Sequence, residues 1–374
     1  MKYLFINSVC GIRSTGRICI DLAEKLEREG HECKIAYGRG EVPEQYKKYA
    51  VRIGNDIDVK MHVIKTRLFD EHGFGSKSAT KKFIKWVELY NPDVIWLHNI
   101  HGYYINVEIL FAWIKKNPNL QVKWTLHDCW AFTGHCAYFT AINCNQWNSN
   151  NGCISCPQLK KYPACYMHSD VKKNLRRKYV AFSGVKNLSL VTPSKWLESL
   201  VKKSFLKDYS IEVVYNTVDR NIFKPTVSNF KEINGLKGKI MVLGVASVWD
   251  DRKGLKDFVT LSKLLDNKYQ IVLVGLNNKQ INRMPQNIIC ISRTNNTKQL
   301  AEIYSAADVF VNPTYEDNYP TVNLESQYCG TKVYAYNTGG TIETIDQNVG
   351  SKIIRVGDIN QLLKLIKQEG NNEN

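Results

Sequence analysis

Short apolar runs alternate along this chain with longer stretches in which apolar residues recur every three or four positions. The runs predict strands, which in the first half lie at residues 3–8, 33–37, 94–97, 122–126 and 188–192. The periodic stretches predict helices there at residues 16–28 and 81–89. The second half repeats the pattern, with strands at 239–246, 271–275 and 288–291 and helices at 254–265 and 297–306. Such alternation is typical of doubly wound parallel sheets with helices on both faces.

A turn-rich stretch at residues 216–225 interrupts the alternation and divides the chain into two α/β halves. Ligands of such sheets bind beyond the carboxyl ends of the strands, so we expect the ligand in a cleft between two Rossmann-like domains. The linker is expected within residues 193–235. In chain order the predicted parts are an N-terminal domain at 1–193, a C-terminal domain at 210–355, and a C-terminal helix with a disordered tail at 356–374, the disorder starting after Lys367.

The most informative stretch follows the buried strand at residues 308–311. A polar turn there holds Glu316 and Asp317, and Glu325 lies in the helix that opens after it. Carboxylates accept hydrogen bonds from sugar hydroxyls, and a helix N-terminus offers N–H groups and a positive dipole to phosphate. The N–H groups expected to hold phosphate are those of Thr321, Val322 and Asn323. The alternative is an ordinary strand-turn-helix with a solvated acidic turn.

Two other turns at strand ends carry residues suited to an anion. Arg252 and Lys253 follow the strand that ends at residue 246, where two cations suit a leaving diphosphate; the alternative is a solvated basic turn. The turn after the first strand has two glycines and two hydroxyls, which permit close backbone approach to an anion, although it is neither a GxGxxG nor a Walker motif. Its residues are Gly11, Ser14, Thr15 and Gly16.

Three histidines also lie in turns at strand ends. His98 and His101 belong to LHNIHG, and His127 to TLHD, where Asp128 could orient the ring of His127. A lone histidine is more often structural than functional. Their role is therefore open on the residues alone.

Taken together, these motifs resemble retaining, GT-B-fold glycosyltransferases of the large family that includes bacterial capsule, O-antigen and exopolysaccharide enzymes, glycosyltransferase family 4-like. Residues 313–325, with Cys329-Gly330-Thr331 after them, resemble its paired-acid signature, and Asn337–Gly340 resembles its Gly-Gly turn. Residues 191–194 and 214–219 resemble its hinge segments. The resemblance covers nearly the whole chain and implies two Rossmann-like domains that face each other across a cleft.

The resemblance implies a role for each acid and cation. Glu325 would bind the ribose of a nucleotide-diphosphate sugar, and the first acid would face the donor sugar. Glu316 is favoured for it because it directly follows the Pro-Thr-Tyr run, whereas Asp317 fits the family's spacing better. The family usually has an Arg five residues before Lys253, where this chain has Val248, so Arg252 would supply the second cation.

The resemblance also implies how the reaction runs. His127 would contact the donor sugar and stabilise the transition state, while His98 and His101 are weaker candidates for acceptor contacts. The glycine-rich turn at residues 11–17 would lie against the donor phosphate. No cofactor and no enzymatic nucleophile are required, because in a front-face displacement the leaving phosphate takes the acceptor proton.

Six of the eleven cysteines crowd into residues 129–165, an excursion from the first domain. Cys153 and Cys156 form a CxxC, and with Cys136 and Cys144 they predict a structural zinc site. His135 and Cys165 are expected as replacements within the set. The alternatives are disulfides, which the lack of an export signal disfavours, or unconnected buried thiols.

The net charge of +16 predicts an anionic partner. Five cations share a short helix, and more lie beside aromatic residues, which fits an anionic membrane surface. Nucleic acid is the rival, but no module that recognises it is found, and a solvated basic face is the other alternative. No apolar run approaches the roughly 20 residues of a membrane span. We expect a cytoplasmic protein, peripheral at the inner face of the cell membrane. The cations are Lys172, Lys173, Arg176, Arg177 and Lys178, followed by Lys195, Lys202 and Lys203.

The sequence thus predicts transfer of a sugar, with retention, from a nucleotide-diphosphate sugar to a saccharide acceptor. We expect this acceptor to be linked to a lipid. Two alternatives remain at this point. One is a nucleotide-sugar epimerase on the same fold, and the other is a non-catalytic, zinc-stabilised basic binding protein. UDP and GDP donors are not distinguished.

Overall fold

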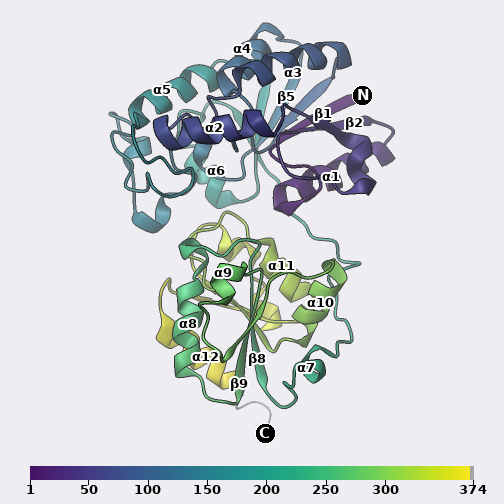
Figure 1. Cartoon of the computed structure of the whole chain (residues 1–374), viewed down its shortest axis with the longest axis vertical. Coiled ribbons are helices and arrows are strands. Elements are labelled where there is room, and N and C mark those ends of the chain that lie inside the picture. The colour runs from purple at the N-terminus through teal and green to yellow at the C-terminus, as the bar shows by residue number, and fades with distance from the viewer. Residues whose placement is uncertain (371–374) are drawn as a thin grey trace. The chain divides into compact units, whose positions relative to one another are not determined.

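The computed structural model describes residues 1–370 and divides into two α/β units, one of residues 1–214 and one from residue 215 onward (Figure 1). Each unit has one sheet in which every strand pair is parallel. Helices cover both faces, as parallel sheets require to bury their apolar strands. The predicted fold class is therefore confirmed. The end of the tail, residues 371–374, for which disorder is expected, lies outside the described residues.

Unit 1 contains seven strands in the order β3-β2-β1-β4-β5-β6-β7. They are β1 (Lys2–Asn7), β2 (Glu32–Tyr37), β3 (Ala50–Arg52), β4 (Val94–Leu97), β5 (Gln121–Thr125), β6 (Leu188–Thr192) and β7 (Ser210–Val213). The helices are α1 (Arg13–Arg28), α2 (Asp56–Phe69), α3 (Lys77–Tyr90), α4 (Val107–Lys116), α5 (Val171–Phe182) and α6 (Lys195–Val201). The sequence pattern assigns residues 210–213 to the C-terminal domain, whereas β7 pairs with β6 in the first sheet.

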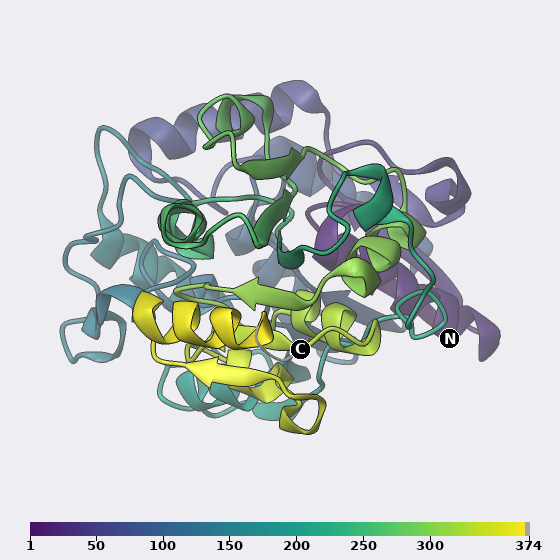
Figure 2. The same ribbon diagram turned by 90° about the horizontal axis from the view of Figure 1, so that it is seen from below.

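Unit 2 contains six strands in the order β10-β9-β8-β11-β12-β13. They are β8 (Ile240–Val245), β9 (Tyr269–Val274), β10 (Ile288–Ile291), β11 (Val309–Asn312), β12 (Val333–Tyr336) and β13 (Lys352–Ile354). The helices are α7 (Phe230–Ile233), α8 (Leu255–Leu264), α9 (Asn278–Ile281), α10 (Thr297–Ala306), α11 (Thr321–Tyr328) and α12 (Ile359–Glu369), the last drawn in yellow in Figure 2. Because α12 extends to Glu369, helix continues past Lys367, where the sequence predicts disorder.

Each sheet has a buried apolar cluster on each face. In unit 1, one cluster lies between the sheet and α1, and the other lies under α3, α4 and α5. In unit 2, α8 and α12 cover one face, while α10 and α11 cover the other. Leu4, Ile95, Val242 and Phe310 are among the fully buried strand residues. The apolar strand runs of the sequence thus correspond to strands buried on both faces.

The strand orders place one switch point in each sheet. In unit 1, the chain proceeds outward from β1 to β2 and β3, then returns to the other side of β1 with β4. In unit 2, β8 and β11 are the corresponding neighbours. Loops that leave two such strands diverge to opposite sides, which opens a crevice at their carboxyl ends. The loops after β1, β4, β8 and β11 are therefore the expected ligand-binding segments.

The basic helix of the sequence is α5, and two of its five cations face inward. The Lys178 ammonium is buried, donates to the carbonyls of Trp130 (2.7 Å) and Thr133 (2.9 Å), and lies 3.7 Å from the centre of the Trp130 ring. Arg177 forms a bidentate ion pair with Glu108 and also contacts Glu71. These two cations anchor α5 to its own unit. The charge that this helix offers to solvent is correspondingly smaller than the sequence suggests.

Burial lowers the pKa of Lys178 to about 7, against an ordinary value of 10.5. Since the folded state has the lower pKa, unfolding takes up a proton between these values, and this lysine makes stability rise with pH there. Replacing Lys178 with Met removes the effect. We expect wild type to gain roughly 1 kcal/mol per pH unit relative to K178M from pH 7 upward, measured by urea unfolding. Parallel pH profiles for the two proteins would show that Lys178 titrates normally.

Candidate functional site

The cations and acids predicted from separate motifs come together at the switch point of unit 2. Arg252 and Lys253 lie in a single 3₁₀ turn (Asp251–Lys253) after β8, and the acidic turn follows β11. Arg252 Nη1 donates to the carbonyl of Glu316 at 2.6 Å, and Lys253 Nζ pairs with the Asp317 carboxylate. The Tyr315 N–H donates back to the Arg252 carbonyl at 2.8 Å. These bonds hold the two loops together as one surface.

The two candidate first acids have different environments. Burial would raise the pKa of Asp317, but Lys253 and Arg252 hold it below its ordinary value, so this carboxylate is ionised. Arg252 Nη1 lies 4.0 Å from the same carboxylate. Glu316 is only 2% exposed, and its backbone carbonyl accepts from Arg252. The Asp317 carboxylate contacts both cations, and the preference for Glu316 as the first acid stays a prediction.

Glu325 is held by a residue that sequence reasoning did not select. The buried Tyr304 hydroxyl, from α10, donates to Glu325 Oε2 at 3.0 Å, and the Thr321 hydroxyl lies 3.4 Å from Oε1. Burial, and then Glu325 itself, raises the pKa of Tyr304, which keeps its hydroxyl protonated as a donor. A tyrosine on the inward face of a neighbouring helix gives no sequence signal for this contact. Glu325 itself is half-buried and remains reachable from solvent.

The N-terminus of α11 has some of the properties of an anion-binding site. Its N-cap residue, Pro320, provides no side-chain cap. Asn323 is internal: its N–H donates to the Pro320 carbonyl at 3.1 Å, and its buried side chain bonds Asn312 and Thr344. Thr321 and Val322 occupy the first helical positions, whose N–H groups have no partner within a helix. Phosphate binding by these residues stays a prediction, with Asn323 the least suited of the three.

The Gly-Gly turn at Asn337–Gly340 is hydrogen-bonded to the acidic turn. Gly340 N–H donates to the Asp317 carbonyl at 3.1 Å, and Thr338 Oγ1 donates to the Tyr315 carbonyl at 2.8 Å. Gly339 has φ +56°, and a Cβ built there would lie 1.8 Å from the same Asp317 carbonyl oxygen. Only glycine therefore fits at position 339.

Replacing Gly339 with Ala should displace the acidic turn. Gly350 offers a matched control, because it also has a left-handed φ, +82°, but nothing lies within 4 Å of its added Cβ. Both variants carry backbone strain of about 1 kcal/mol, and G339A should lose about 2 kcal/mol more from the clash. Denaturant unfolding of the two variants measures the difference. Equal losses would mean that the contact with Asp317 relaxes without cost.

In unit 1, the turn after β1 is tied to the turn after β4. The Asn7 side chain donates to Thr15 Oγ1 at 3.3 Å and accepts the Asn99 N–H at 3.2 Å. Gly11 has φ +70°, and Gly11 N–H donates to the Gly16 carbonyl at 3.3 Å, which closes a tight loop. The buried Asn7 was missed, although a polar residue ending a buried strand was the available signal. Of the four residues predicted here, Ser14 is exposed, Thr15 is half-buried, and Gly11 and Gly16 are buried.

His98 and His127 form a pair at the ends of β4 and β5. His98 Nδ1 lies 3.1 Å from His127 Nε2, with the rings stacked 5.3 Å apart. Burial lowers the pKa of His127 to about 4 and that of His98 well below its ordinary value, so both rings are neutral near pH 7. His127 is half-buried and His98 is 2% exposed, which makes His127 the more accessible ring. The ring nitrogen His98 Nε2 has no hydrogen-bond partner within residues 1–370.

Asp128 orients His101, where the sequence suggested that it would orient His127. His101 Nε2 lies 3.0 Å from Asp128 Oδ2, and since a carboxylate only accepts, this nitrogen carries a proton. The Tyr162 hydroxyl lies 3.1 Å from Nδ1 on the other side of the ring. Burial opposes ionisation of Asp128, but His101 keeps its pKa low. His101 is 6% exposed, and both of its ring nitrogens have a partner. An acceptor contact through His101 or His98 stays a prediction.

The predicted zinc site is not found. Within the described part of the chain, no group of three or more His, Cys, Asp or Glu side chains could hold a metal ion, and no disulfide joins any of the eleven cysteines. Cys136 and Cys153 pack in the apolar cluster of unit 1, and half-buried Cys144 and Cys156 border it. Cys153 Sγ accepts the Gly134 N–H at 3.3 Å, and the Cys136 and Cys156 thiols are hydrogen-bonded to each other. The cysteine spacing therefore reflects packing of the excursion.

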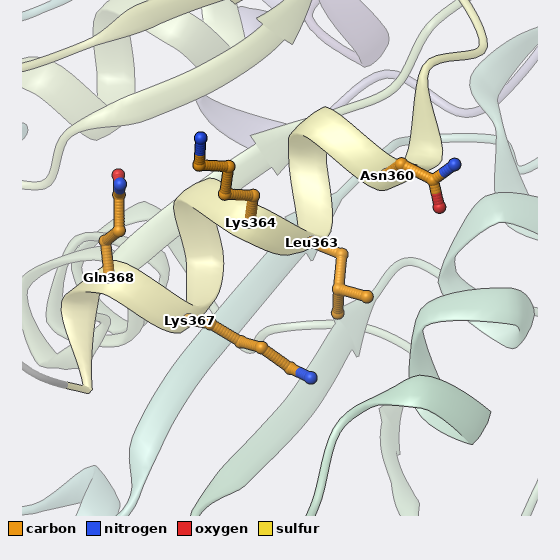
Figure 3. A pocket seen from close by; sticks show the side chains of 5 residues that line it. All are labelled: Asn360, Leu363, Lys364, Lys367 and Gln368. Atoms are coloured by element: carbon orange, nitrogen blue, oxygen red, sulfur yellow. The ribbon is translucent and has the colours of Figure 1, made fainter.

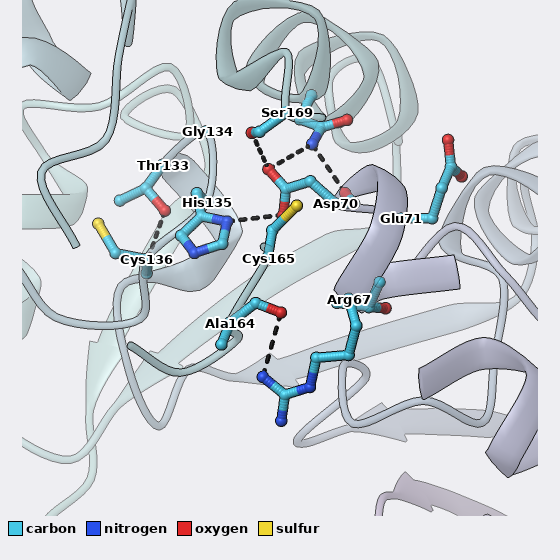
Figure 4. Close-up of polar contacts among 12 residues, drawn as sticks. Arg67, Asp70, Glu71, Thr133, Gly134, His135, Cys136, Ala164, Cys165 and Ser169 are labelled. Atoms are coloured by element: carbon cyan, nitrogen blue, oxygen red, sulfur yellow. Dashed lines mark hydrogen bonds and ion pairs between the residues drawn. The ribbon is translucent and has the colours of Figure 1, made fainter. Parts of the chain in front are cut away.

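The two expected replacement ligands are engaged elsewhere, and Figure 4 shows the contact of His135 with Asp70. His135 Nδ1 lies 2.6 Å from the buried Asp70 carboxylate, which also accepts from Ser169 at 2.6 Å and from Asn174 at 3.1 Å. Cys165 Sγ bonds the His168 carbonyl. Asp70 directly follows α2, so this polar cluster joins the excursion to α2 and α5. It has a structural role that cysteine spacing did not reveal.

A surface hollow of about 390 Å³ in unit 2 lies away from these residues. It is lined by the outer side chains of α12, which Figure 3 shows spread along the helix. Its residues are Asn360, Leu363, Lys364, Lys367 and Gln368. In unit 1, a cavity of about 10 Å³ lies among His98, His101, His127 and Asp128. That volume holds no more than one water-sized group.

Residues 15–221 match the family model described as Glycosyltransferase Family 4, which covers more than half of the chain. The chain belongs to glycosyltransferase family 4. Residues 227–374 of this glycosyltransferase match a second model, Glycosyl transferases group 1. Over 367 residues it is 23% identical to the "putative colanic acid biosynthesis glycosyl transferase WcaC" of Escherichia coli, covering 94% of this chain and 87% of the relative. A Campylobacter jejuni N,N'-diacetylbacillosaminyl-diphospho-undecaprenol α-1,3-N-acetylgalactosaminyltransferase is 22% identical over 37% of this chain and 38% of its own.

Solved structures share the fold of this glycosyltransferase. Sucrose-phosphate synthase from Thermosynechococcus elongatus superposes with a TM-score of 0.70 at 15% identity, covering 98% of this chain and 89% of that chain. Anabaena HepE in complex with UDP-glucose gives a TM-score of 0.62 at 15% identity, with 98% and 89% covered. WaaG, a glycosyltransferase of lipopolysaccharide biosynthesis, gives 0.65 at 14% identity, with 99% and 90% covered. The GT-B fold expected from the sequence is confirmed.

Proposed function

We propose that this family 4 glycosyltransferase moves a sugar, with retention, from a nucleotide-diphosphate sugar to a lipid-linked saccharide during synthesis of a bacterial surface polysaccharide. The observation that carries the donor assignment is the cluster of Arg252, Lys253 and Asp317 at the switch point of unit 2, beside the N-terminus of α11. Two cations and a helix N-terminus in one crevice suit a diphosphate. Glu325, half-buried in the same helix, suits the ribose hydroxyls.

The ion pair suggests how the site handles charge. Within the chain, the Asp317 carboxylate pairs with the Lys253 ammonium. The diphosphate of a bound donor would be a second anion for the same cation. As the glycosidic bond breaks, negative charge grows on the leaving phosphate. Lys253 and Arg252 would stabilise that charge, which is the type of interaction that lowers a barrier most. The phosphate then takes the acceptor proton, so the proposal needs no enzymatic base.

The neutral state of His127 fits a hydrogen-bonding role. With a pKa of about 4, its ring carries no charge at working pH and can exchange a hydrogen bond with a sugar hydroxyl. Its partner His98 restricts the ring by the 3.1 Å contact between their nitrogens. We place His127 against the donor sugar on the strength of the family resemblance. The Gly11–Gly16 turn of the same unit would approach the donor phosphate with its backbone.

The acceptor assignment is supported by the relatives. The Escherichia coli relative carries colanic acid biosynthesis in its name, and the name of the Campylobacter jejuni relative specifies a diphospho-undecaprenol acceptor. HepE provides the parallel for the donor, because it has been solved with UDP-glucose. A lipid-linked acceptor would bring this enzyme to the inner face of the cell membrane. Retention is proposed from the resemblance of residues 313–325 to the paired-acid signature.

Replacing Glu325 with Ala should weaken nucleotide binding. The carboxylate supplies hydrogen bonds to the ribose, and loss of a charged acceptor lowers affinity about tenfold or more. Calorimetric titration with UDP and GDP measures the change and identifies the base. Y304F, which leaves the carboxylate but removes its 3.0 Å partner, should fall between E325A and wild type. Unchanged affinity in both variants would remove Glu325 from the donor site.

Replacing Lys253 with Ala should slow turnover about a hundredfold with a smaller effect on KM, since the cation acts on charge that develops in the transition state. Lys256 provides the control: its side chain is 83% exposed and pairs with Asp251 in the same segment. K256A should keep wild-type rates, and K253R should retain part of the activity. Release of nucleoside diphosphate from a panel of UDP- and GDP-sugars provides the readout. A K253A rate equal to that of K256A would contradict the assignment.

The same assay separates transferase from epimerase. A transferase consumes the donor in proportion to added acceptor, whereas an epimerase converts it with no second substrate. Donor conversion to an isomeric nucleotide sugar without acceptor would overturn the proposed reaction while leaving the nucleotide site intact. The matches to two glycosyltransferase models favour the transferase.

A further inference from the structure

Helix α2 turns an apolar stripe outward. Its buried side, which faces the rest of unit 1, carries His62 and Thr66. The opposite side carries Ile57, Met61 and Ile64, which follow one another at helical spacing and are 70%, 49% and 48% exposed. Half-buried Leu68 continues the stripe by one more turn. The usual amphipathic pattern would place polar residues on this outer face.

The exposed apolar surface continues at the carboxyl end of α2 and in the segment beside it. Phe69 is 55% exposed, and the segment that contains Tyr166 and Met167 runs beside the end of α2, with these two side chains 62% and 72% exposed. Tyr166 N–H donates to the Arg67 carbonyl at 2.8 Å, which fixes the segment there. We call the set of Ile57, Met61, Ile64, Leu68, Phe69, Tyr166 and Met167 the α2 face. An exposed apolar surface of this extent marks an interaction site in a soluble unit.

After the first turn of α2, the charges beside the α2 face have one sign. From Val59 to Phe69 the helix has three cations and no acid. Lys60 and Lys65 are exposed and flank the stripe on its two sides, as helical geometry of 100° per residue requires. The two acids of the helix, Asp56 and Asp58, lie in its first turn, where Asp56 pairs with Arg52 and Asp58 completes the N-terminal capping box. The cations are therefore available to an external anion.

We propose that the α2 face docks this protein on an anionic lipid bilayer. The apolar stripe would enter the boundary between headgroups and acyl chains, and Lys60 and Lys65 would extend their ammonium groups to the lipid phosphates. Lysines on both sides of an apolar stripe match a bilayer of anionic lipids, which is apolar within and carries negative charge all around the inserted stripe. The membrane location belongs to the proposed function, but the docking surface rests on α2 alone and stands whether or not the chain transfers sugar.

This surface differs from the one that the sequence suggests. The basic run on α5 has Arg177 and Lys178 turned inward, so only Lys172, Lys173 and Arg176 remain exposed there. Along the described chain no helix combines the length and apolar character that a membrane span requires. The α2 face is an interfacial surface of a different kind, lying along the bilayer plane.

Co-sedimentation of the whole protein with vesicles, in the absence of donor and acceptor, tests the proposal. Vesicles of phosphatidylcholine mixed with phosphatidylglycerol should bind wild type, and pure phosphatidylcholine should bind it about tenfold less. M61E/I64E should lose binding about tenfold or more, because two carboxylates then meet the anionic surface. L89E is the control, since Leu89 lies on α3 of the same unit and is 86% exposed; it should bind as wild type.

Three results would overturn the proposal. The first is wild-type protein that does not sediment with anionic vesicles, and the second is M61E/I64E that binds as well as L89E. The third is a wild-type dimer in solution that M61E/I64E converts to a monomer, since a second copy would then cover the α2 face. K60Q/K65Q provides an independent arm: it leaves the stripe intact and should weaken binding only to the anionic vesicles. Nucleotide binding by each variant, measured separately, distinguishes a failure of docking from a failure of the donor site.

Discussion

The contact between Lys253 and Asp317 is the interaction on which the arrangement of the donor site depends. Each residue belongs to a different loop, one after β8 and one after β11, and both side chains are largely withdrawn from solvent at 19% and 13% exposure. A charge in that environment is costly unless it is paired, so each loop requires the other. The Arg252 bond to the Glu316 carbonyl and the Gly340 bond to the Asp317 carbonyl then restrict the acidic turn from two sides. The crevice that parallel-sheet topology opens thereby acquires a defined charge pattern.

In unit 1, the loops at the strand ends are joined by neutral groups. His98 and His127 are uncharged because they are buried, and their contact joins the loops after β4 and β5. The excursion of residues 129–165 is attached to those loops through Tyr162, which reaches His101. Lys178 holds the excursion in place by donating hydrogen bonds to two of its backbone carbonyls. A segment without long helices or strands is thus fixed by buried polar contacts, and it forms part of the wall beside the predicted histidines.

Much of this structure could be predicted, and the failures have specific physical causes. Strands buried on both faces give apolar runs, so both sheets could be predicted from the sequence. Because both motifs follow such strands, the sequence also indicated that the Arg252-Lys253 turn and the acidic turn lie at one edge of the second sheet. Helix α2 was missed because its outer face is as apolar as its inner one, which hides the helical period. Lys178 was grouped with the cations expected to face an anionic membrane, although its spacing from Val171 and Asn174 matches the buried side of α5.

The site was less predictable than the fold, because its contacts join elements far apart in the chain. No local pattern connects Tyr304 to Glu325, or Tyr162 to His101. The zinc prediction failed for the opposite reason: the cysteines are close in sequence, and close spacing alone cannot separate metal ligands from thiols packed against aromatic rings. Roles for the individual donor-site residues still rest on the family resemblance.

The division of the chain between residues 214 and 215 has an evolutionary consequence. Among residues 1–370, every strand pair and each of the four apolar clusters lies within one unit, so no cluster draws residues from both halves. Substitutions that refit one half to a new ligand therefore leave the packing of the other unchanged. Since the cations proposed for the diphosphate and the carboxylate proposed for the ribose lie in unit 2, a lineage could acquire a new acceptor through unit 1 while it keeps its nucleotide. Diversity in surface glycans would then arise by recombining halves as well as by point mutation.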